Sequence, residues 1–418
     1  MSAGREVVVT GIGLITALDK SAASASTVRT SVWTSETWTR LMAGESAIAL
    51  RQPFLDLAPG PLAMIAKQPM DLTKMTRRLA IETWEDAFSC QGASLTDQLS
   101  SHSERDGLER CGVVVGSSRS HLQQMETMAL HQRQFPGEVP REVPDKLSNN
   151  WLDSLAHGPA LTVARSLGIN GGPLLAPMAA CATGVWAVAQ GAELIRTGQC
   201  DRVIAGAVEA PITRLTLAGF RKMGALAKTG CYPFDVAREG FVLAEGGALM
   251  LLESADLARQ RDARVYGRVL GVGITNDSHH VSSFDPSYAM GRRAVELCLA
   301  RSELRADAVD AIHTHGTSTA QNDRMEASLI ADLLGQQPAV MASKGATGHT
   351  LGASGALIVA LGLMSLYRQE LVPCVGLRAP EFDLNFVRAG RAAALRNILG
   401  FSFGFGGQNA VLALSRFE

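Results

Sequence analysis

The chain has 418 residues, a length that suits two fused units or one large layered domain better than a single simple core. Hydrophobic residues make up 46% of it and charged residues 19%, which is typical of a folded globular protein and excludes a disordered chain. The net charge of −1 provides no basic field for nucleic acid, and we expect no apolar run long enough to span a membrane.

The chain starts with MSAGREVVVTGIG, which leads directly into a strand-like run. This start lacks the basic, apolar and cleavage regions of a signal peptide, so we expect a cytoplasmic protein. Gly11 and Gly13 match the first two glycines of a dinucleotide-binding fingerprint. Thr16 stands where the third glycine belongs, which disfavours an NAD-dependent oxidoreductase.

Strand-like and helical runs then alternate along the chain, which predicts an α/β architecture. The predicted strands are Val7–Val9, Gly112–Val115, Val203–Val208, Leu249–Leu252 and Val411–Leu414, and the clearest helices are Leu79–Phe88, Val185–Arg196 and Leu357–Arg368. Two polar stretches interrupt this pattern. We interpret Asp19–Thr39 as a surface excursion and Gln132–Asn150 as a long loop.

Two helical segments are related to each other in sequence. Thr183–Cys200 aligns with Ser354–Leu371 without gaps, and both segments are unusually apolar and rich in Gly and Ala. A helix that is hydrophobic all round must be buried, so we expect one central helix in each half of a duplicated core. A charged stretch, Asp256–Arg264, marks the boundary between residues 1–255 and residues 256–418.

Seven cysteines are present, and none lies in a C-x-x-C pair, which argues against a disulfide framework and a structural zinc site. Cys181 is distinctive because it lies where a strand-like run turns into a helix. Unpaired N–H groups and the helix dipole at that position favour the thiolate, so Cys181 is the candidate nucleophile. The competing interpretation is a buried structural cysteine.

Two histidines lie in glycine-rich turns of the second half. His315 follows an apolar run, and His349 precedes the second central helix, at nearly the place that Cys181 occupies in the first half. Lys344 adds a cation five residues before His349. Each histidine can also be a satisfied polar residue. A zinc site built from His313, His315 and His349 is disfavoured, because no carboxylate or cysteine lies at a short spacing.

Phe405 lies in the segment GFSFGFGGQN, between Gly404 and Gly406. Glycines permit unusual backbone angles, so this ring can gate a pocket and its N–H can face a reacting oxygen. The alternative is a tight turn with a core phenylalanine.

Together these segments resemble the β-ketoacyl-ACP synthase family of the thiolase-fold superfamily, and most closely its elongating members of fatty-acid and polyketide pathways. The resemblance covers nearly the whole chain. It lies in VVVTGIG, ACATG, VIAGAVEA, YPFDVAREGFVLAEGGALMLLE, THGTSTAQND, SKGATGHTLGASGA and FGFGGQNA. It implies a thiolase-like fold, in which duplicated βαβ halves form a layered α/β/α/β/α core.

The same resemblance implies roles for particular residues. Cys181 receives an acyl group from an acyl carrier protein, and His315 and His349 assist decarboxylation of malonyl-carrier protein. Lys344 supports them, Phe405 gates the site, and the N–H groups of Cys181 and Phe405 form an oxyanion hole. No metal or other cofactor is implied, because the substrates are carried on the phosphopantetheine of the carrier protein and loss of CO2 drives the reaction.

The resemblance also implies a homodimer, with Val203–Val208 as the pairing strand, or a heterodimer with a related subunit. Alternatives are a ketosynthase subunit that acts with a chain-length-factor-like partner, and a thiolase-fold acyltransferase without elongation. A thiolase is disfavoured because FGFGGQN occupies the place of its second cysteine. Departures from the family pattern at Ala244, Gln408 and the run from Gly116 to Arg119 favour a specialised synthase with its own acyl substrate.

Overall fold

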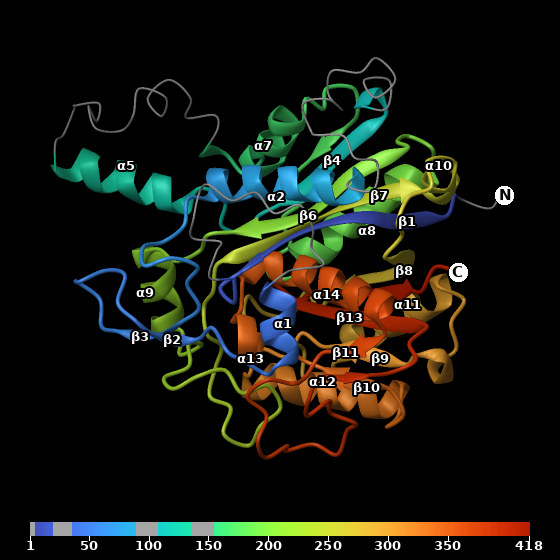
Figure 1. Cartoon of the computed structure of the whole chain (residues 1–418). Helices are drawn as coiled ribbons and strands as arrows, with labels where there is room; N and C mark the ends of the chain where they lie inside the picture. The colour runs from blue at the N-terminus through green and yellow to red at the C-terminus, as the bar shows by residue number, and fades with distance from the viewer. Residues whose placement is uncertain (1–4, 20–35, 89–107, 135–153) are drawn as a thin grey trace.

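The computed structural model describes residues 5–19, 36–88, 108–134 and 154–418 (Figure 1). These residues form a ten-stranded sheet in the order β10-β9-β13-β14-β8-β1-β7-β6-β4-β5. The strands of the first half are β1 (Val7–Thr16), β4 (Cys111–Gly116), β5 (Leu174–Leu175), β6 (Arg202–Glu209) and β7 (Gly246–Ser254). Those of the second half are β8 (Gly267–Asn276), β9 (Ala311–His313), β10 (Ala339–Met341), β13 (Asn397–Gly404) and β14 (Gln408–Ser415).

The two halves of the sheet repeat one topology. β1 pairs antiparallel with β7 and β7 with β6, whereas β6 pairs parallel with β4 and β4 with β5. In the second half, β8, β14, β13, β9 and β10 follow one another in the same sequence of directions. The halves meet where Val8 pairs with Arg268. The duplicated thiolase-like core predicted from the sequence is therefore confirmed. The division between residues 255 and 256 stays a prediction; helix α10 (Ala255–Gln260) lies at that point.

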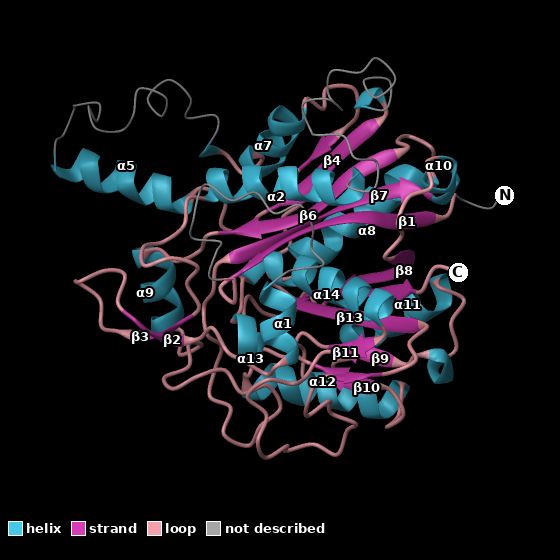
Figure 2. Ribbon diagram, in the orientation of Figure 1, coloured by secondary structure: helices cyan, strands magenta, loops and turns pink. Residues whose placement is uncertain are grey.

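Helices cover and separate the two half-sheets, as Figure 2 shows by colour. Helices α2 (Leu72–Phe88) and α7 (Gly158–Leu167) cover the outer face of the first half-sheet. Helices α8 (Thr183–Arg196) and α14 (Ser354–Arg368) lie between the half-sheets, and α11 (Ala289–Arg301) and α12 (Ala320–Leu333) cover the second. This is the layered arrangement that the sequence predicts.

The two central helices cross at glycines near their first turns. A Cβ atom at Gly184 of α8 would overlap the backbone of Ala356, and one at Gly355 of α14 would lie 2.8 Å from the backbone nitrogen of Val185. The contact is reciprocal, as expected for halves related by a pseudo-twofold axis. It brings the amino-terminal ends of both helices together, so the segments just before them can form one site.

One helical segment among the described residues, Leu351–Arg368, is long and apolar enough to span a membrane. The expectation that the chain has no such run is therefore wrong, since this segment meets the criterion by its length and its composition. The segment comprises a short 3₁₀ turn (Leu351–Ala353) and α14, and 89% of it is buried inside the protein. Its apolar surface packs against both half-sheets, which is typical of a core helix.

Both stretches predicted as surface segments need correction where they are described. Asp19–Thr39 includes the start of helix α1 (Glu36–Met42), where Trp38 is buried and donates a hydrogen bond from Nε1 to Glu370 at 3.1 Å. Residues 20–35 lie outside the described residues. Gln132–Asn150 begins inside helix α5 (Leu122–Gln134), and its remainder also lies outside them.

The strand predicted to pair two protomers is not available for that purpose. Val203–Val208 lies within β6, which is hydrogen-bonded to β4 on one edge and to β7 on the other. The continuous apolar run there indicates burial and does not indicate a free edge. At this end of the described sheet the outermost strand is β5, where Leu174 and Leu175 are each 37% exposed.

Short elements complete the described chain. These are β2 (Ala49–Arg51), β3 (Gly60–Leu62), α9 (Arg214–Lys222), α13 (Lys344–Thr347), a 3₁₀ turn (Ala306–Ala308), β11 (Glu370–Leu371) and β12 (Arg391–Ala392). The hairpin of β2 and β3 lies beside α9 (Figure 1).

Candidate active site

Cys181 lies in a tight turn between β5 and α8. Ala180, directly before it, adopts a left-handed conformation with φ of +46°, which is uncommon for a residue with a side chain. The hydroxyl of Thr183 accepts a hydrogen bond from the backbone of Ala179 at 2.9 Å and donates to the carbonyl of Ala180 at 2.7 Å. From the second half, the hydroxyl of Ser402 donates to the Cys181 carbonyl at 3.0 Å. The turn is therefore fixed from both halves of the chain.

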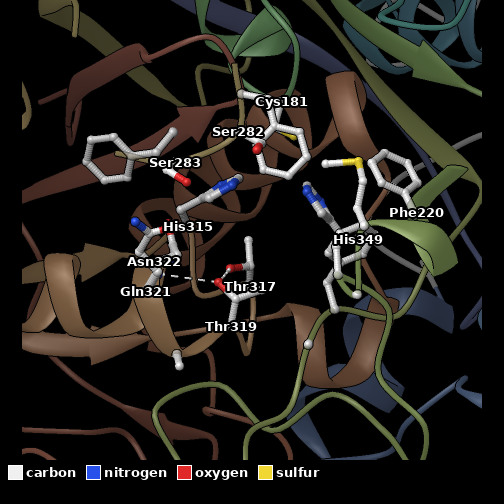
Figure 3. Close-up of a pocket in the computed structure, with 18 of the residues that line it drawn as sticks. Cys181, Phe220, Ser282, Ser283, His315, Thr317, Thr319, Gln321, Asn322 and His349 are labelled. Carbon is white, nitrogen blue, oxygen red and sulfur yellow. Dashed lines mark hydrogen bonds between the residues drawn. The ribbon is translucent and has the colours of Figure 1, made fainter. Parts of the chain in front are cut away.

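The structure brings the predicted nucleophile and both predicted histidines together. Cys181 Sγ, one imidazole nitrogen of His315 and one of His349 lie within 4.8 Å of one another. The two imidazole rings meet edge to face, with their centres 5.3 Å apart. All three side chains are buried and point into one cavity of about 400 Å³ (Figure 3).

Lys344 determines which nitrogen of His315 carries the proton. Its Nζ lies 3.4 Å from His315 Nδ1 and also donates a hydrogen bond to the His315 carbonyl. An ammonium group has no lone pair, so Nδ1 must accept and the proton of the neutral ring is on Nε2. His315 therefore presents an N–H donor.

The sequence analysis missed the residues that hold the His315 turn. Glu326, on α12, accepts hydrogen bonds from the backbone N–H groups of His315 and Gly316, each at 2.6 Å. The Asn322 side chain donates to the same carboxylate at 2.7 Å. Asn322 and Glu326 lie four residues apart on one helical face directly after the THGTST turn, and this spacing is the signal that could have revealed them.

His349 is anchored independently of His315. Its Nδ1 lies 2.8 Å from the hydroxyl of Ser354, and its backbone N–H donates to the carbonyl of Val242 at 2.7 Å. The ring of Phe241 meets the imidazole edge to face at 5.1 Å. With Nδ1 occupied by Ser354, Nε2 is the nitrogen left for the cavity.

The electrostatics of the site favour neutral imidazoles. Burial, reinforced by the charge of Lys344, lowers the pKa of both His315 and His349 well below 6.5. Burial also lowers the pKa of Lys344 to about 8, while it raises the pKa of Glu326. At neutral pH the two imidazoles are thus donors to a developing negative charge and carry no charge themselves.

Burial opposes the thiolate that the helix terminus was expected to favour at Cys181. Burial raises the pKa of Cys181 to about 11, and the positive charge of Lys344 opposes that effect only in part. The backbone N–H of Phe405 faces the sulfur and also acts to lower the pKa of the thiol. The helix terminus on which the prediction relied is outweighed by desolvation in a closed pocket.

Phe405 lies over the same cavity on a loop of glycines. Gly406 and Gly407 have φ of +78° and +73°, in the left-handed region that favours glycine. The Phe405 ring is partly buried beside Cys181, and its centre lies 6.3 Å from that of Phe220. The N–H of Gly406 donates to the carbonyl of Val281 at 2.9 Å, which attaches the loop to a neighbouring segment.

Hydroxyl and amide side chains also line the cavity, and the sequence analysis did not single them out. Thr317 and Thr319 lie on the turn after His315, with hydroxyl oxygens 2.9 Å apart. Ser282, Ser283 and Gln321 lie nearby (Figure 3). These groups offer hydrogen-bond donors and acceptors along a path that ends at the sulfur.

The donor set Cys181, His315 and His349 is also of a kind that zinc accepts. The zinc alternative considered from sequence was built on His313, whose Nε2 instead lies 3.0 Å from the Ser343 hydroxyl. The ammonium of Lys344 beside His315 disfavours a second cation at this place. The absence of a metal cofactor stays a prediction.

Comparisons with known proteins agree with this geometry. The sequence profile "Beta-ketoacyl synthase, N-terminal domain" matches residues 4–258, and "Beta-ketoacyl synthase, C-terminal domain" matches residues 266–378. The chain is 32% identical over 321 residues to 3-oxoacyl-[acyl-carrier-protein] synthase 2 of Staphylococcus aureus (strain COL), covering 74% of this chain and 76% of that one.

Solved structures show the same fold. The ishigamide ketosynthase/chain length factor superposes with a TM-score of 0.83 at 25% identity and full coverage of both chains. A β-ketoacyl synthase from Burkholderia phymatum gives 0.82 at 26% identity, covering 99% of this chain and 100% of that one. An acyl-carrier protein in complex with its type II polyketide ketosynthase gives 0.84 at 24% identity, covering 99% of this chain and 100% of that one, a likeness of fold alone.

Proposed function

The chain belongs to the β-ketoacyl synthase family, and we propose that it joins an acyl group held on Cys181 to malonyl-[acyl-carrier-protein] with loss of CO2. The observation that carries this proposal is the convergence of the Cys181 sulfur and two neutral imidazoles within 4.8 Å in one buried cavity. A soft nucleophile, two N–H donors and a dry pocket are what a decarboxylative condensation requires.

The first step transfers an acyl group to the enzyme. The Cys181 sulfur attacks the thioester carbonyl of an acyl-carrier protein, the new S–C bond forms, and the bond to the pantetheine sulfur breaks. The thiol proton leaves Cys181 for the pantetheine sulfur, with an imidazole of the site as the nearest carrier. We assign the oxyanion that forms on the way to the N–H groups of Cys181 and Phe405; the Phe405 N–H facing the sulfur supports this assignment.

The second step forms the new carbon–carbon bond. Malonyl-carrier protein loses CO2, and the electron pair of the broken bond becomes an enolate whose oxygen lies between His315 and His349. His315 donates through its Nε2–H, because the Lys344 ammonium at Nδ1 can only donate; His349 does the same when the Ser354 hydroxyl donates to its Nδ1. The enolate carbon attacks the acyl–Cys181 carbonyl. The Cys181 thiolate leaves and takes up one proton, and the product is a 3-oxoacyl-carrier protein.

The surroundings of the cavity suit a substrate carried on phosphopantetheine. Thr317 and Thr319 can bind the amide groups of the pantetheine arm. Phe220 and Met223 line the mouth, and between them Arg221 and Lys222 place positive charge where an acidic carrier protein would dock. The scheme needs no cofactor beyond the carrier, and we place the enzyme in the cytoplasm.

The assembly that we propose is a homodimer paired through β5. Leu174, Leu175 and Met178 are exposed along this edge of the sheet, immediately before the Cys181 turn. A related subunit, as in the ishigamide ketosynthase/chain length factor, is the alternative partner. Within each chain, residues 1–255 carry the cysteine and residues 256–418 the two histidines.

A product assay tests this function. The purified protein is incubated with acyl-carrier protein and malonyl-carrier protein, and the carrier proteins are analysed by mass spectrometry while released CO2 is counted. A condensing enzyme produces equal amounts of 3-oxoacyl-carrier protein and CO2. An acyltransferase without elongation would become acylated and release no CO2, and that result would refute the proposal.

A further inference from the structure

Two buried carboxylates lie close together behind the His315 turn. Asp323 and Glu326 are three residues apart on α12, and both are completely buried. The oxygens of Glu326 accept the backbone N–H groups of the His315 turn. Those of Asp323 accept from the backbone of Ser318 at 3.1 Å and of Phe234 at 2.7 Å. Two negative charges so close in an apolar interior repel each other, which favours uptake of a proton by one of them.

One amide group lies between these two acids. The Nδ2 atom of Asn322 lies 2.7 Å from Glu326 Oε2 and 3.1 Å from Asp323 Oδ1. Its two protons can be divided between the acids, and the amide cannot be turned around, because its oxygen would then face two other oxygens. Hydrogen bonds of this kind favour the charged form of a carboxyl group. The bond from Asn322 accordingly lowers the pKa of Asp323, against burial, which raises it.

Asn322 leaves part of its own polar group unsatisfied. The residue is only 3% exposed in the wall of the cavity, and its Oδ1 atom has no hydrogen-bond partner among the described residues. A buried polar atom without a partner is unfavourable for the folded state. An asparagine at this place is therefore explained by its two N–H groups, which serve Glu326 and Asp323.

The two acids connect Asn322 to the charge at the reacting centre. Burial lowers the pKa of Lys344 to about 8, and the negative charges of Glu326 and Asp323 oppose that effect. The other titratable groups that act on Lys344, or on which its charge acts, are Cys181, Cys231, His313, His315 and His349. Burial keeps both thiols protonated and the imidazoles neutral. Within this set, only the two acids can supply negative charge to Lys344 at neutral pH.

We propose that Asn322 is a positioning residue of the condensation: its amide keeps the two acids ionised behind the His315 turn, and the acids keep Lys344 charged beside His315. The fixed Nε2–H donor of His315 then depends on a side chain that acts through other residues. This inference rests on the proposed function, since its effect on the reaction is measured as CO2 release.

The pH dependence of CO2 release from malonyl-carrier protein separates this role from a merely structural one. Asn322→Leu keeps the approximate size of the side chain and removes both N–H groups. The acids then favour their protonated forms, so the pKa of Lys344 moves further below 10.5. The alkaline midpoint should move down by roughly half a pH unit or more, while the rate at pH 6.5 stays within about threefold of the wild type. A damaged fold would lower the rate by the same factor at every pH.

The charge of Lys344 can also be measured without turnover. In protein labelled with carbon-13 at the Cε atoms of lysine, the resonance that disappears in Lys344→Arg identifies Lys344, and its titration gives the pKa. This pKa should be lower in Asn322→Leu than in the wild type. When Asn322→Leu is added to Lys344→Arg, the alkaline midpoint of Lys344→Arg should stay in place, because a guanidinium keeps its charge without help from the acids.

Asn385→Leu is the matched control. Asn385 also donates from its amide, to the carbonyl of Gln337 at 3.1 Å, but it is exposed and does not line the cavity. Its substitution should change neither the pH profile nor the pKa of Lys344. Circular dichroism establishes that each variant is folded; if Asn322→Leu is not, Asn322→Ala replaces it.

Three results would overturn the inference: an unchanged pKa of Lys344 in the folded Asn322 variant, a loss of rate that is equal at every pH, or a downward shift of the midpoint that persists in the Lys344→Arg background. If the wild type released no CO2 from malonyl-carrier protein, the proposed function itself would fail. The titration of Lys344 would still decide whether Asn322 controls its charge.

Discussion

A single side chain, Lys344, links the charge of the site to the proton positions of both histidines. Its ammonium lies 3.4 Å from His315 Nδ1, and its charge contributes to the lowered pKa of His315 and of His349. The imidazoles therefore stay neutral far below pH 6.5, and they can donate hydrogen bonds across the physiological range. What limits the site at high pH is Lys344, because burial lowers its pKa to about 8.

The pH dependence of condensation follows from this arrangement. As pH rises through about 8, Lys344 loses its proton, and with it the charge that holds His315 as the Nε2–H tautomer. Wild-type activity should therefore fall above about pH 8 and stay level between pH 6.5 and 7.5. In Lys344→Arg, whose guanidinium keeps its charge, the alkaline midpoint should move upward by more than one pH unit. An unchanged midpoint in that variant would contradict the assignment.

The two histidines should affect one half-reaction more than the other. His315→Ala or His349→Ala removes an N–H donor to the enolate oxygen, so CO2 release from malonyl-carrier protein should fall about 100-fold or more. Transfer of an acyl group to Cys181 should be reduced less in either single variant, because its oxyanion is bound by backbone N–H groups and the remaining imidazole can still carry the thiol proton. His157→Ala serves as the control, because His157 lies directly before the first residue of α7 and does not line the cavity. If both site variants decarboxylate at the wild-type rate, their assigned role is wrong.

Among the elements, the loop of Phe405 is the one whose movement the reaction requires. Its ring is only partly buried, and Gly406 and Gly407 hold left-handed backbone angles, so the loop can rearrange at little steric cost. Phe405→Ala should therefore remain folded and acylated but condense poorly or lose its order of substrate addition. A core ring would instead cost about 3–5 kcal/mol of unfolding free energy. A large drop in melting temperature with unchanged chemistry per folded molecule would exclude a gate.

The crossing of α8 and α14 gives a second prediction at this scale. Because Gly184 leaves no room for a Cβ atom beside Ala356, Gly184→Val should separate the two helices and destabilise the fold by about 3 kcal/mol or more. The matched control is Gly219→Ala on α9, where a Cβ atom would meet nothing within 4 Å. Thermal unfolding compares the two variants. Equal melting temperatures would show that the crossing is not a structural constraint.

The helices and strands that were predicted best are those whose apolar residues indicate burial. The apolar runs gave five strands and both central helices, because a segment buried on all sides must be apolar throughout. The role of Val203–Val208 was wrong for the same reason: an apolar strand indicates burial, and burial does not tell a sheet centre from an edge. The start of α1 was missed because Ser and Thr dominate the segment before it and conceal the apolar residues that the helix buries, Trp38 and Leu41.

The site was only partly predictable, for a related reason. Glycine-rich turns before helices pointed to Cys181, His315 and His349 because the local sequence carries the signal for such turns. Glu326 and Ser354, which orient the histidines, lie within helices and resemble ordinary helix residues. The pKa of Cys181 depends on how completely the fold excludes water, and no local pattern encodes that.

At the scale of the whole molecule, the exposed edge of β5 predicts how two chains associate. Among the described residues, no strand pairs with the outer edge of β5, and Leu174 and Leu175 present apolar side chains there, shortly before the catalytic turn. In light scattering at micromolar concentration, we expect twice the chain mass of 44.3 kDa. Leu174→Pro, which removes a backbone donor that faces away from β4, should shift the mass toward one chain. A monomeric wild type would exclude the homodimer and favour a related subunit as partner.

The whole account depends on Cys181 as the residue that holds the acyl chain and then releases it to the extender. Intact mass of the enzyme, followed over time, measures this directly. With acyl-carrier protein alone, the mass should rise by one acyl group; after addition of malonyl-carrier protein, it should return to its starting value as 3-oxoacyl-carrier protein appears. Cys181→Ala should show no gain. A gain of the same mass by Cys181→Ala, or an acyl group that stays on the wild type when malonyl-carrier protein is added, would contradict the account.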